Sequence, residues 1–309
     1  MVARLILGLH GALLLSGCAT FQPPISVDDP PAAVAARPFP SGKLPVALVL
    51  SGGSARGFAH IGVIKVLEAH ALKPDIIVGS SAGSIVGALY ASGLTAAELE
   101  AAVAQLDSSV LNDYVLPGLG FLPGEMGFVR GEKLHRFIDA HLKRHHIQDF
   151  PIRFAAVATE LSTGKVVAFN SGDAGLAVVA SSAAPGVITP VYIDRNHYGD
   201  GQIASPLPVA KARELGAKVI IAVDVTYPPE DAFVYSAVGV LFQAFAISAH
   251  RLKEYEKTEA DLVVAPVLPK TPGQFAFTDR QRLIAAGEKT ALDMLPAIRA
   301  AFAKNALGR

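Results

Sequence analysis

The sequence predicts an α/β fold with a mainly parallel central sheet, and three observations carry that prediction. Two apolar stretches, LPVALVLSGG from Leu44 and PDIIVGS from Pro74, have the unbroken hydrophobicity of buried strands. A helical pattern follows each of them directly, and strands that alternate with helices favour parallel pairing through right-handed crossovers. After residue 44 the chain has neither an internal repeat nor a change in composition. We therefore expect one folded domain over residues 44–305.

The first helices follow from apolar spacing and from capping residues. The helix after the first strand places four apolar side chains at helical spacing, namely Phe58, Ile61, Ile64 and Leu67. A second helix is expected over 81–92, with Gly93 closing it. Thr95 is expected to cap a third helix that runs through Leu106, because TAAE matches a capping box.

Residues 107–131 interrupt this regular pattern. Their sequence, DSSVLNDYVLPGLGFLPGEMGFVRG, has loosely spaced apolar residues and repeated glycine. A functional lid and an irregular connection are both compatible with it. A helix from Glu132 follows, and it is expected to bury Leu134, Phe137, Ile138 and Leu142. We expect its other side to be a solvated face, which carries Lys133, Arg136, Lys143 and Arg144. The alternative is that these cations contact phospholipid headgroups.

The remaining elements alternate in the same way. IRFAAVATEL and KVVAFN flank STG and predict a strand hairpin. A small-residue segment over 175–191 and the short stretch YIDRNHYGDGQ come next. We then expect a helix over 206–215, a buried strand KVIIAVDVT, a long helix to about Thr258, a strand ADLVVAPV and a final helix from Asp279.

Composition excludes several classes of function. Lys and Arg together number 27, as do Asp and Glu, so global charge gives no support to nucleic-acid binding. A single cysteine builds neither a disulfide framework nor a thiolate metal site within one chain. No acidic loop has calcium-binding spacing, and His145 and His146 lack the spacing of paired ligands on a helix. We expect no metal and no cofactor, while oligomeric state is not encoded in any pattern.

The amino terminus has the organisation of a secretory leader. MVARLILGLHGALLLSGC places Arg4 before an apolar run that is too short to span a bilayer. LSGC resembles a bacterial lipobox, which predicts a signal peptide over 1–17, lipidation at Cys18 and a lipid anchor in the cell envelope. Ala19 favours the outer membrane, facing the periplasm. The alternative is a buried helix with a chance cysteine. Residues 18–43, rich in Pro and Ala, predict an extended tether.

The segment VGSSAGSIVGA has the pattern of a nucleophile elbow. Ser81 follows a predicted strand and begins a predicted helix, and glycines flank it at Gly79 and Gly83. These positions need glycine because the turn is strained and neighbouring backbone passes close by. The positive end of the helix favours an alkoxide and the anion formed after attack. In the alternative interpretation Ser81 is a plain helix cap.

A second glycine-rich turn, SGGSARG, follows the first strand. Such a loop can direct several backbone N–H groups into one concavity, as an oxyanion site requires, and Arg56 adds positive charge beside it. A phosphate cradle is the alternative. It is disfavoured because the turn lacks both the Lys-Ser/Thr ending of a P-loop and the glycine spacing of a dinucleotide site.

The dipeptide Asp200-Gly201 has two interpretations. Asp200 could approach the elbow and accept the Ser81 proton, or it could be an ordinary hairpin turn residue. A histidine triad would need a histidine after Asp200, and His250, expected inside a helix, is the one residue that qualifies. We expect His250 to be an ordinary helix residue and His60 to pack or cap locally.

Four motifs together carry a resemblance to a known family. SGGSARGFAHIGVIKVLE, GSSAGS, ASSAAPG and GDG occur in the order found in patatin-like phospholipases, and the likeness is greatest to a bacterial lipoprotein branch. The resemblance covers about Leu44 to Thr226. It implies a three-layer α/β/α fold and a dyad of Ser81 as nucleophile and Asp200 as its partner. It also implies an oxyanion hole formed by the loop residues Gly52, Gly53 and Ser54, with Arg56 as support.

Two positions depart from the family pattern. Ser54 stands where a third glycine is usual, so a positive φ there would strain the loop. Gln202 follows Gly201 where Gly or Ala is common. Neither departure removes a reacting group. The resemblance implies a serine acyl hydrolase acting on phospholipid or lysophospholipid esters at a membrane surface. The alternative is a non-catalytic envelope lipoprotein that binds lipid or scaffolds partners on the same fold.

Overall fold

The computed structural model describes residues 25–106, 108–111, 113–114, 126–229, 237–269 and 277–306. The predicted signal peptide and Cys18 lie outside the described residues. So does much of the predicted lid over 107–131. Its described part forms a short 3-10 turn, Ser108–Leu111, and the strand β3, Gly127–Val129.

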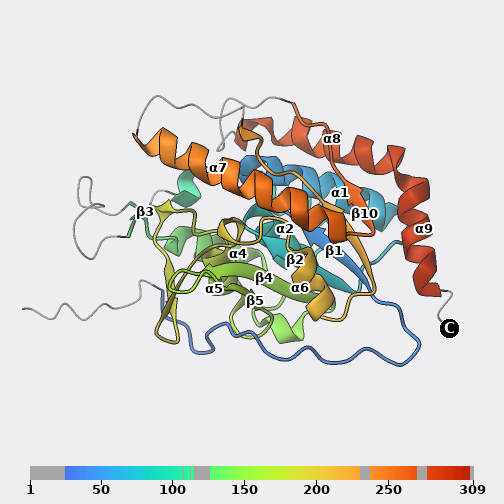
Figure 1. The fold of residues 1–309 in the computed structure, drawn as a ribbon, viewed down its shortest axis with the longest axis horizontal. Coiled ribbons are helices and arrows are strands. Elements are labelled where there is room, and N and C mark those ends of the chain that lie inside the picture. Colours follow the sequence, from blue (N-terminus) through green and yellow to red (C-terminus); the bar gives the residue numbers. More distant parts are fainter. Residues whose placement is uncertain are drawn as a thin grey trace, which may run out of the picture.

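A mainly parallel sheet forms the centre of the domain (Figure 1), as predicted. Its strand order is β10-β9-β1-β2-β4-β8-β7, with β5 paired to β4. The strands from β10 to β4 are parallel, whereas β5, β7 and β8 join in antiparallel fashion. The bounds are β1 Val46–Leu50, β2 Ile76–Ser80, β4 Arg153–Glu160, β5 Val166–Phe169, β7 Val191–Ile193, β8 Asn196–Asp200, β9 Val219–Val223 and β10 Leu262–Val264. A separate parallel pair joins β3 to β6, Gly186–Ile188.

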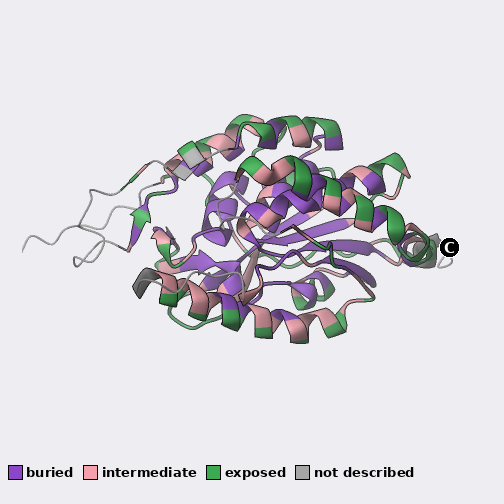
Figure 2. Ribbon diagram, turned by 90° about the horizontal axis from the view of Figure 1, so that it is seen from above, coloured by how far each residue is buried: buried purple, intermediate pink, exposed green. Residues whose placement is uncertain are grey.

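Helices cover both faces of this sheet, which gives the expected three layers. Alternate residues of β1 point to opposite faces, so Leu48 joins the larger core cluster and Val49 the smaller one. The sheet is buried between helices whose outer residues are exposed (Figure 2). The helices are α1 Phe58–Ala69, α2 Ala82–Ala91, α3 Ala96–Ala104, α4 Glu132–His141, α5 Ala174–Ser181, α6 Val209–Glu214, α7 Ala237–Glu256, α8 Arg280–Asp293 and α9 Leu295–Ala306.

Most predicted elements are present, and the exceptions have physical causes. The final helix predicted from Asp279 is two helices, α8 and α9, which meet between Met294 and Leu295. Pro296 explains the break, because its ring clashes with the preceding turn and it has no N–H to donate. The small-residue segment over 175–191, given no structure in advance, supplies most of α5 and all of β6.

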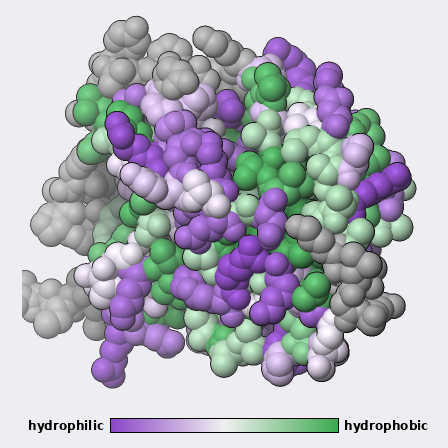
Figure 3. Space-filling view, turned by 45° about the vertical axis from the view of Figure 1, so that its right-hand side comes forward, coloured by the Kyte–Doolittle hydropathy of each residue, from purple (hydrophilic) through white to green (hydrophobic). Residues whose placement is uncertain are grey.

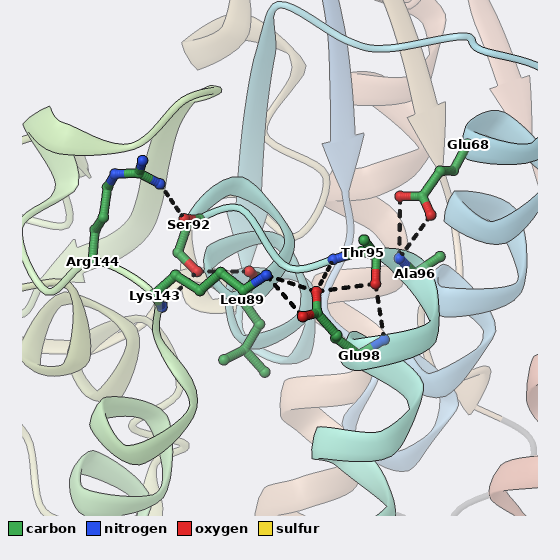
Figure 4. Close-up of polar contacts among 8 residues, drawn as sticks. All are labelled: Glu68, Leu89, Ser92, Thr95, Ala96, Glu98, Lys143 and Arg144. Atoms are coloured by element: carbon green, nitrogen blue, oxygen red, sulfur yellow. Dashed lines mark hydrogen bonds and ion pairs between the residues drawn. The ribbon is translucent and has the colours of Figure 1, made fainter.

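The predicted cationic face of α4 is only partly correct. The helix ends at His141, so Lys143 and Arg144 lie beyond it. Lys143 Nζ pairs with a Glu98 carboxylate oxygen at 2.8 Å, and Arg144 Nη1 donates to the Ser92 carbonyl at 2.9 Å (Figure 4). Lys143 therefore binds the first turn of α3 and Arg144 binds the end of α2, which weighs against their use for headgroups.

The predicted caps and core of these helices can be compared directly. Thr95 and Glu98 form the predicted capping box (Figure 4). In and just after α4, Leu134, Ile138 and Leu142 are buried, whereas Phe137 is only half-buried. The four apolar positions predicted for α1 are all buried.

Residues 25–43 are extended, but they lie against the domain. Ala32 forms an antiparallel bridge with Ser171, and Val34 exchanges two hydrogen bonds with the Asn170 side chain. The Arg153 guanidinium stacks over the Phe39 ring at 3.5 Å. This stretch of the expected tether is thus held to the edge of the sheet next to β5.

The surface is mixed in character. On the face drawn in Figure 3, hydrophobic side chains gather in patches between hydrophilic ones. Within the described ranges, no helix combines the length and the hydrophobicity needed to cross a membrane.

Candidate active site

Ser81 stands at a strained turn between β2 and α2. Its φ of 52° and ψ of −124° lie in a region that residues with a side chain rarely adopt. Hydrogen bonds hold this conformation: the Ser81 N–H donates to the backbone oxygen and to Oγ of Ser181, each at 3.1 Å, and the Ser81 carbonyl accepts from Ser84 Oγ at 2.7 Å. The backbone around the hydroxyl is therefore fixed.

Both flanking glycines are required by close backbone contacts. A Cβ on Gly79 would lie 2.4 Å from the Gly83 carbonyl oxygen. A Cβ on Gly83 would lie 2.2 Å from the Leu50 carbonyl oxygen. These distances are far below van der Waals contact. Glycine at position 79 lets the start of α2 lie against the end of β2, and glycine at position 83 lets it lie against the end of β1. The predicted steric reason for the Gly-x-Ser-x-Gly pattern is confirmed.

Asp200 is the last residue of β8 and not a hairpin turn residue. The turn between β7 and β8 lies instead at Asp194 and Arg195, which have φ values of 46° and 68°. Asp200 donates its N–H to the Ala183 carbonyl at 2.9 Å, and its own carbonyl accepts from Thr159 Oγ1 at 2.9 Å. The hairpin-turn interpretation is wrong because strand pairing with β4 holds Asp200, which then caps the short 3-10 turn Gly201–Ile203.

The structure brings Ser81 and Asp200 into direct contact. Ser81 Oγ donates a hydrogen bond to Asp200 Oδ2 at 2.8 Å. The other carboxylate oxygen, Oδ1, accepts from the Gln202 N–H at 2.8 Å, so the position after Gly201 contributes its backbone to the site. Ser81 makes no side-chain cap to α2, and the alternative of a plain helix cap is therefore wrong.

The Asp200 carboxyl group has an unusual affinity for protons. Burial raises its pKa from 3.8 to about 7, although the hydrogen bonds from the Gln202 N–H and the Ser81 hydroxyl act in the opposite direction. A carboxylate with a pKa near neutrality is a stronger base than an exposed aspartate and is still ionised in a large share of molecules at pH 7. The geometry and the basicity of Asp200 both suit proton transfer from Ser81.

The predicted oxyanion loop is present, with one correction. Gly53 and Ser54 line the same pocket as Ser81. Gly52 does not supply a free donor, because its N–H is bonded to the Pro206 carbonyl at 3.1 Å. Ser54 has a φ of 51°, so the strain expected from its substitution for glycine is present. Among the described residues no backbone carbonyl accepts from the N–H groups of Gly53 and Ser54, so two donors of the predicted three are left for an anion.

Arg56 connects the oxyanion loop to the chain segment that follows β9. Its Nε donates to the Val225 carbonyl at 3.1 Å, and its guanidinium lies 5.8 Å from the centre of the Tyr227 ring. Gly53 packs on the same carbonyl, since a Cβ there would lie 2.4 Å from the Val225 oxygen. The Val225 N–H in turn donates to Ser51 Oγ at 2.8 Å. The chain after β9 is thus bonded to the loop from both sides.

A buried ion pair, which sequence reasoning missed, holds this chain segment to α7. Lys253 Nζ lies 2.8 Å from Asp224 Oδ2, and the two side chains are only 10% and 8% exposed. Asp224 Oδ1 also accepts from the Thr226 N–H at 3.0 Å. The sequence does not predict this ion pair, because a lysine in a charged stretch of a helix is normally solvated. The pair connects α7 to the backbone that supports Gly53.

Breaking this pair is expected to destabilise the domain. In Lys253→Met the Asp224 carboxylate would remain buried without its partner, which costs about 3 kcal/mol of unfolding free energy. Urea unfolding at pH 7 measures the loss. The double variant Lys253→Met with Asp224→Asn removes the unpaired charge and should recover part of it. A single variant as stable as the wild type would contradict the assigned role.

An apolar pocket opens above the two side chains. It contains about 1130 Å³ of space, including its open mouth. Ser81 and Asp200 supply polar atoms on its wall, beside Gln202 and Thr226. The rest is mostly hydrophobic and comes from distant parts of the chain, including Phe58, Ile85, Val86, Leu134, Ile188, Phe242, Phe245 and Phe277. Such a surface favours a hydrocarbon chain over a charged or sugar-like ligand.

The histidines do not build a triad. His60 is fully buried, its Nε2 lies 2.9 Å from the Ser51 carbonyl oxygen, and burial lowers its pKa to about 4. His250 is half-buried on α7 and does not line the pocket. In the part of the chain that the structure describes, the Asp200 carboxylate bonds to Ser81 and Gln202 and to no imidazole. The triad alternative is therefore not supported.

One cluster has residue types that could hold a metal ion. His135 Nδ1 lies 3.4 Å from Asp139 Oδ2, and His135 Nε2 lies 3.2 Å from Asp173 Oδ1. Burial lowers the His135 pKa, but the two carboxylates outweigh it and the net effect is an increase. Each carboxylate already contacts one ring nitrogen of His135 directly, Asp139 on Nδ1 and Asp173 on Nε2. The arrangement therefore fits an ionic link between α4 and α5.

The chain is similar to several known proteins. Residues 48–213 match the family model described as patatin-like phospholipase. An uncharacterized NTE family protein of Mycobacterium bovis is 37% identical over 193 residues, which cover 62% of this chain and 52% of that protein. Lysophospholipase NTE1 of Coccidioides immitis is 36% identical over 180 residues, which cover 58% of this chain and 11% of that protein.

The chain spans about half the length of the mycobacterial relative and a much smaller share of the fungal one. Among solved structures, VipD from Legionella pneumophila is similar with 15% sequence identity and a TM-score of 0.48. That match covers 82% of this chain and 67% of VipD.

Proposed function

This chain belongs to the patatin-like phospholipase family, and we propose that it is a serine acyl hydrolase that cleaves acyl esters of phospholipids or lysophospholipids. The observation that carries the proposal is the 2.8 Å hydrogen bond from Ser81 Oγ to Asp200 Oδ2 on the wall of an apolar pocket. Nucleophile and base are already within proton-transfer distance. The space beside them accepts a hydrocarbon chain.

Acyl transfer follows from this geometry in two steps. Asp200 takes the Ser81 proton while Oγ attacks the ester carbonyl carbon, and the new oxyanion is stabilised by the N–H groups of Gly53 and Ser54 and by the start of α2. Asp200 then gives the proton to the departing alcohol, and an acyl-Ser81 ester remains. A water molecule, deprotonated by Asp200, attacks this ester. The fatty acid leaves and Ser81 recovers its proton.

The class of substrate is argued from the pocket and the relatives. The mostly hydrophobic walls suit an acyl chain, and the polar atoms gather where the ester would lie. The fungal relative is named as a lysophospholipase, which supports esters of that class. Neither a metal ion nor a cofactor is required by the steps above.

We further propose that the protein is a lipid-anchored envelope protein. The leader-like stretch before Cys18 and the lipobox LSGC support it. Anchoring at Cys18 would place the enzyme at a membrane, with Ala19 favouring the outer membrane facing the periplasm. Mass spectrometry of the amino-terminal peptide tests this by its acyl mass.

An assay over a panel of lipids tests the proposed reaction. The wild-type chain is incubated with phosphatidylcholine, lysophosphatidylcholine, triacylglycerol and a short-chain p-nitrophenyl ester, and free fatty acid is measured by mass spectrometry. Release with many turnovers is expected from at least one glycerophospholipid. Tight binding of lipid with no release from any of the four would overturn the enzyme and favour the lipid-binding alternative.

A further inference from the structure

Helix α7 has two halves of opposite character. Residues 237–249, AVGVLFQAFAISA, contain no Asp, Glu, Lys, Arg or His. Residues 250–256, HRLKEYE, are mostly ionisable. The whole helix lies beyond residues 48–213, the region that matches the family model. Its uncharged half is thus a feature of this chain that the family match does not explain.

The inner side of the uncharged half forms one wall of the pocket. Phe242, Phe245, Ala246 and Ala249 line the pocket together with Ser81 and Asp200. Ala246 and Ala249 are buried there. The apolar residues on the inner side are therefore explained by contact with the proposed substrate.

The outer side of the same half is apolar and exposed. Val240 is 53% exposed, Leu241 68% and Ile247 41%. With the exposed Ala244 and Ser248 they follow helical spacing, and these five residues form the α7 outer face. A helix on the surface of a soluble domain normally turns a polar side to water. On this half of α7 hydrophobic side chains occupy both the inner and the outer side. The outer side therefore suits contact with an apolar environment other than the pocket.

We propose that the α7 outer face lies on the surface of a phospholipid bilayer while its inner side walls the pocket. The identity of the partner rests on the proposed function. An enzyme that takes acyl chains into a pocket on one side of α7 would find its substrate in a bilayer on the other side. The continuity of the pocket wall with the outer face favours a bilayer over a protein partner. Acyl chains would then have an apolar path along one helix.

The charge pattern agrees with shallow binding and sets its orientation. The uncharged half can enter the interface, whereas the exposed Arg251 and Tyr255 of the other half remain in contact with water. Lys253 is paired with the buried Asp224, and Glu256 accepts hydrogen bonds from Ser205 and Leu207. Arg251 is therefore the exposed cation of this half, and strong selection of anionic lipid is not expected. Binding should be driven by apolar burial and depend little on salt.

The absence of tryptophan from the sequence allows a local probe. Leu241→Trp is made in the full chain together with Ser81→Ala, which prevents hydrolysis of the vesicles. Phosphatidylcholine vesicles with brominated acyl chains are added. We expect the indole emission to shift to the blue and to be quenched. Leu292→Trp, at a 52% exposed leucine on α8, is the matched control and should show neither change.

Two outcomes would overturn the proposal. An indole at position 241 that stays in water while the protein sediments with the vesicles would show that another segment binds them. A blue shift without vesicles that grows with protein concentration would show that a second copy covers the face. Quenching at position 241 in a protein whose wild type releases no fatty acid would support the membrane surface and refute the proposed reaction, so the two failures can be distinguished.

A charged variant adds a functional readout. Leu241→Glu is expected to lower fatty acid release from phosphatidylcholine vesicles about tenfold, because the outer face loses an apolar anchor. Hydrolysis of a soluble short-chain ester should be unchanged. Equal losses on both substrates would point to a damaged pocket and contradict the proposal.

Discussion

Ser81→Ala is expected to lower acyl-ester hydrolysis by about a thousandfold or more, because removal of a catalytic nucleophile leaves only binding and oxyanion stabilisation. The variant lacks the hydroxyl that donates to the Asp200 carboxylate, while the N–H and carbonyl bonds of residue 81 are kept. Lipid binding should therefore persist. Fatty acid release and covalent labelling by a fluorophosphonate probe are the measurements.

A second pocket serine provides the control for this experiment. Ser182 lines the same pocket and is buried, but among the described residues its Oγ has no hydrogen-bond partner that could take a proton. Ser182→Ala should keep both labelling and turnover. If Ser81→Ala is still labelled and Ser182→Ala is not, the nucleophile has been assigned to the wrong serine.

The elbow was predictable because its signals are local. Two glycines, a preceding apolar run and a following helix pattern lie within a few residues of Ser81, and the structure confirms the steric reason for both glycines. Asp200 is different. It is 119 residues away in the chain, and only the resemblance carried by four ordered motifs predicted their meeting.

The details that prediction missed depend on tertiary contacts. Gly52 looked equivalent to Gly53 in the motif, but only the fold places the Pro206 carbonyl where it takes the Gly52 N–H. The Lys253 and Asp224 pair likewise joins a helix to a chain segment 29 residues away. The break at Pro296, by contrast, had a local signal, since proline seldom continues a helix.

The same comparison explains why the Asp200 turn interpretation failed. Asp-Gly is a strong turn signal only when its residues are free to bend the chain. Here β8 pairs with β4 up to Asp200, and the hairpin turn is made earlier, at Asp194 and Arg195. Strand pairing, which is invisible in a dipeptide, decides between the two interpretations. It also delivers the carboxylate to Ser81.

Asp200→Asn is expected to reduce turnover by about a thousandfold or more at pH 8, since an amide cannot accept the Ser81 proton. In the wild type the base must be ionised. With the Asp200 pKa raised to about 7 by burial, hydrolysis should rise with pH through that value and level off above it. A rate that is constant from pH 5 to pH 8 would contradict Asp200 as the base.

The same substitution should stabilise the fold at high pH. Because the pKa of Asp200 is raised from 3.8 to about 7 in the folded protein, its contribution to stability is full below pH 4 and is lost as pH rises through 7. Asparagine carries no charge, so the Tm of Asp200→Asn should exceed that of the wild type by a few degrees at pH 8 and by less at pH 5.

Asp194→Asn, at an exposed turn, is the control and should change neither turnover nor this pH dependence. A variant that loses turnover and is also less stable than the wild type at pH 8 would show that the ionised Asp200 carboxylate stabilises the fold. That result would contradict the expectation that its burial destabilises the wild type at this pH.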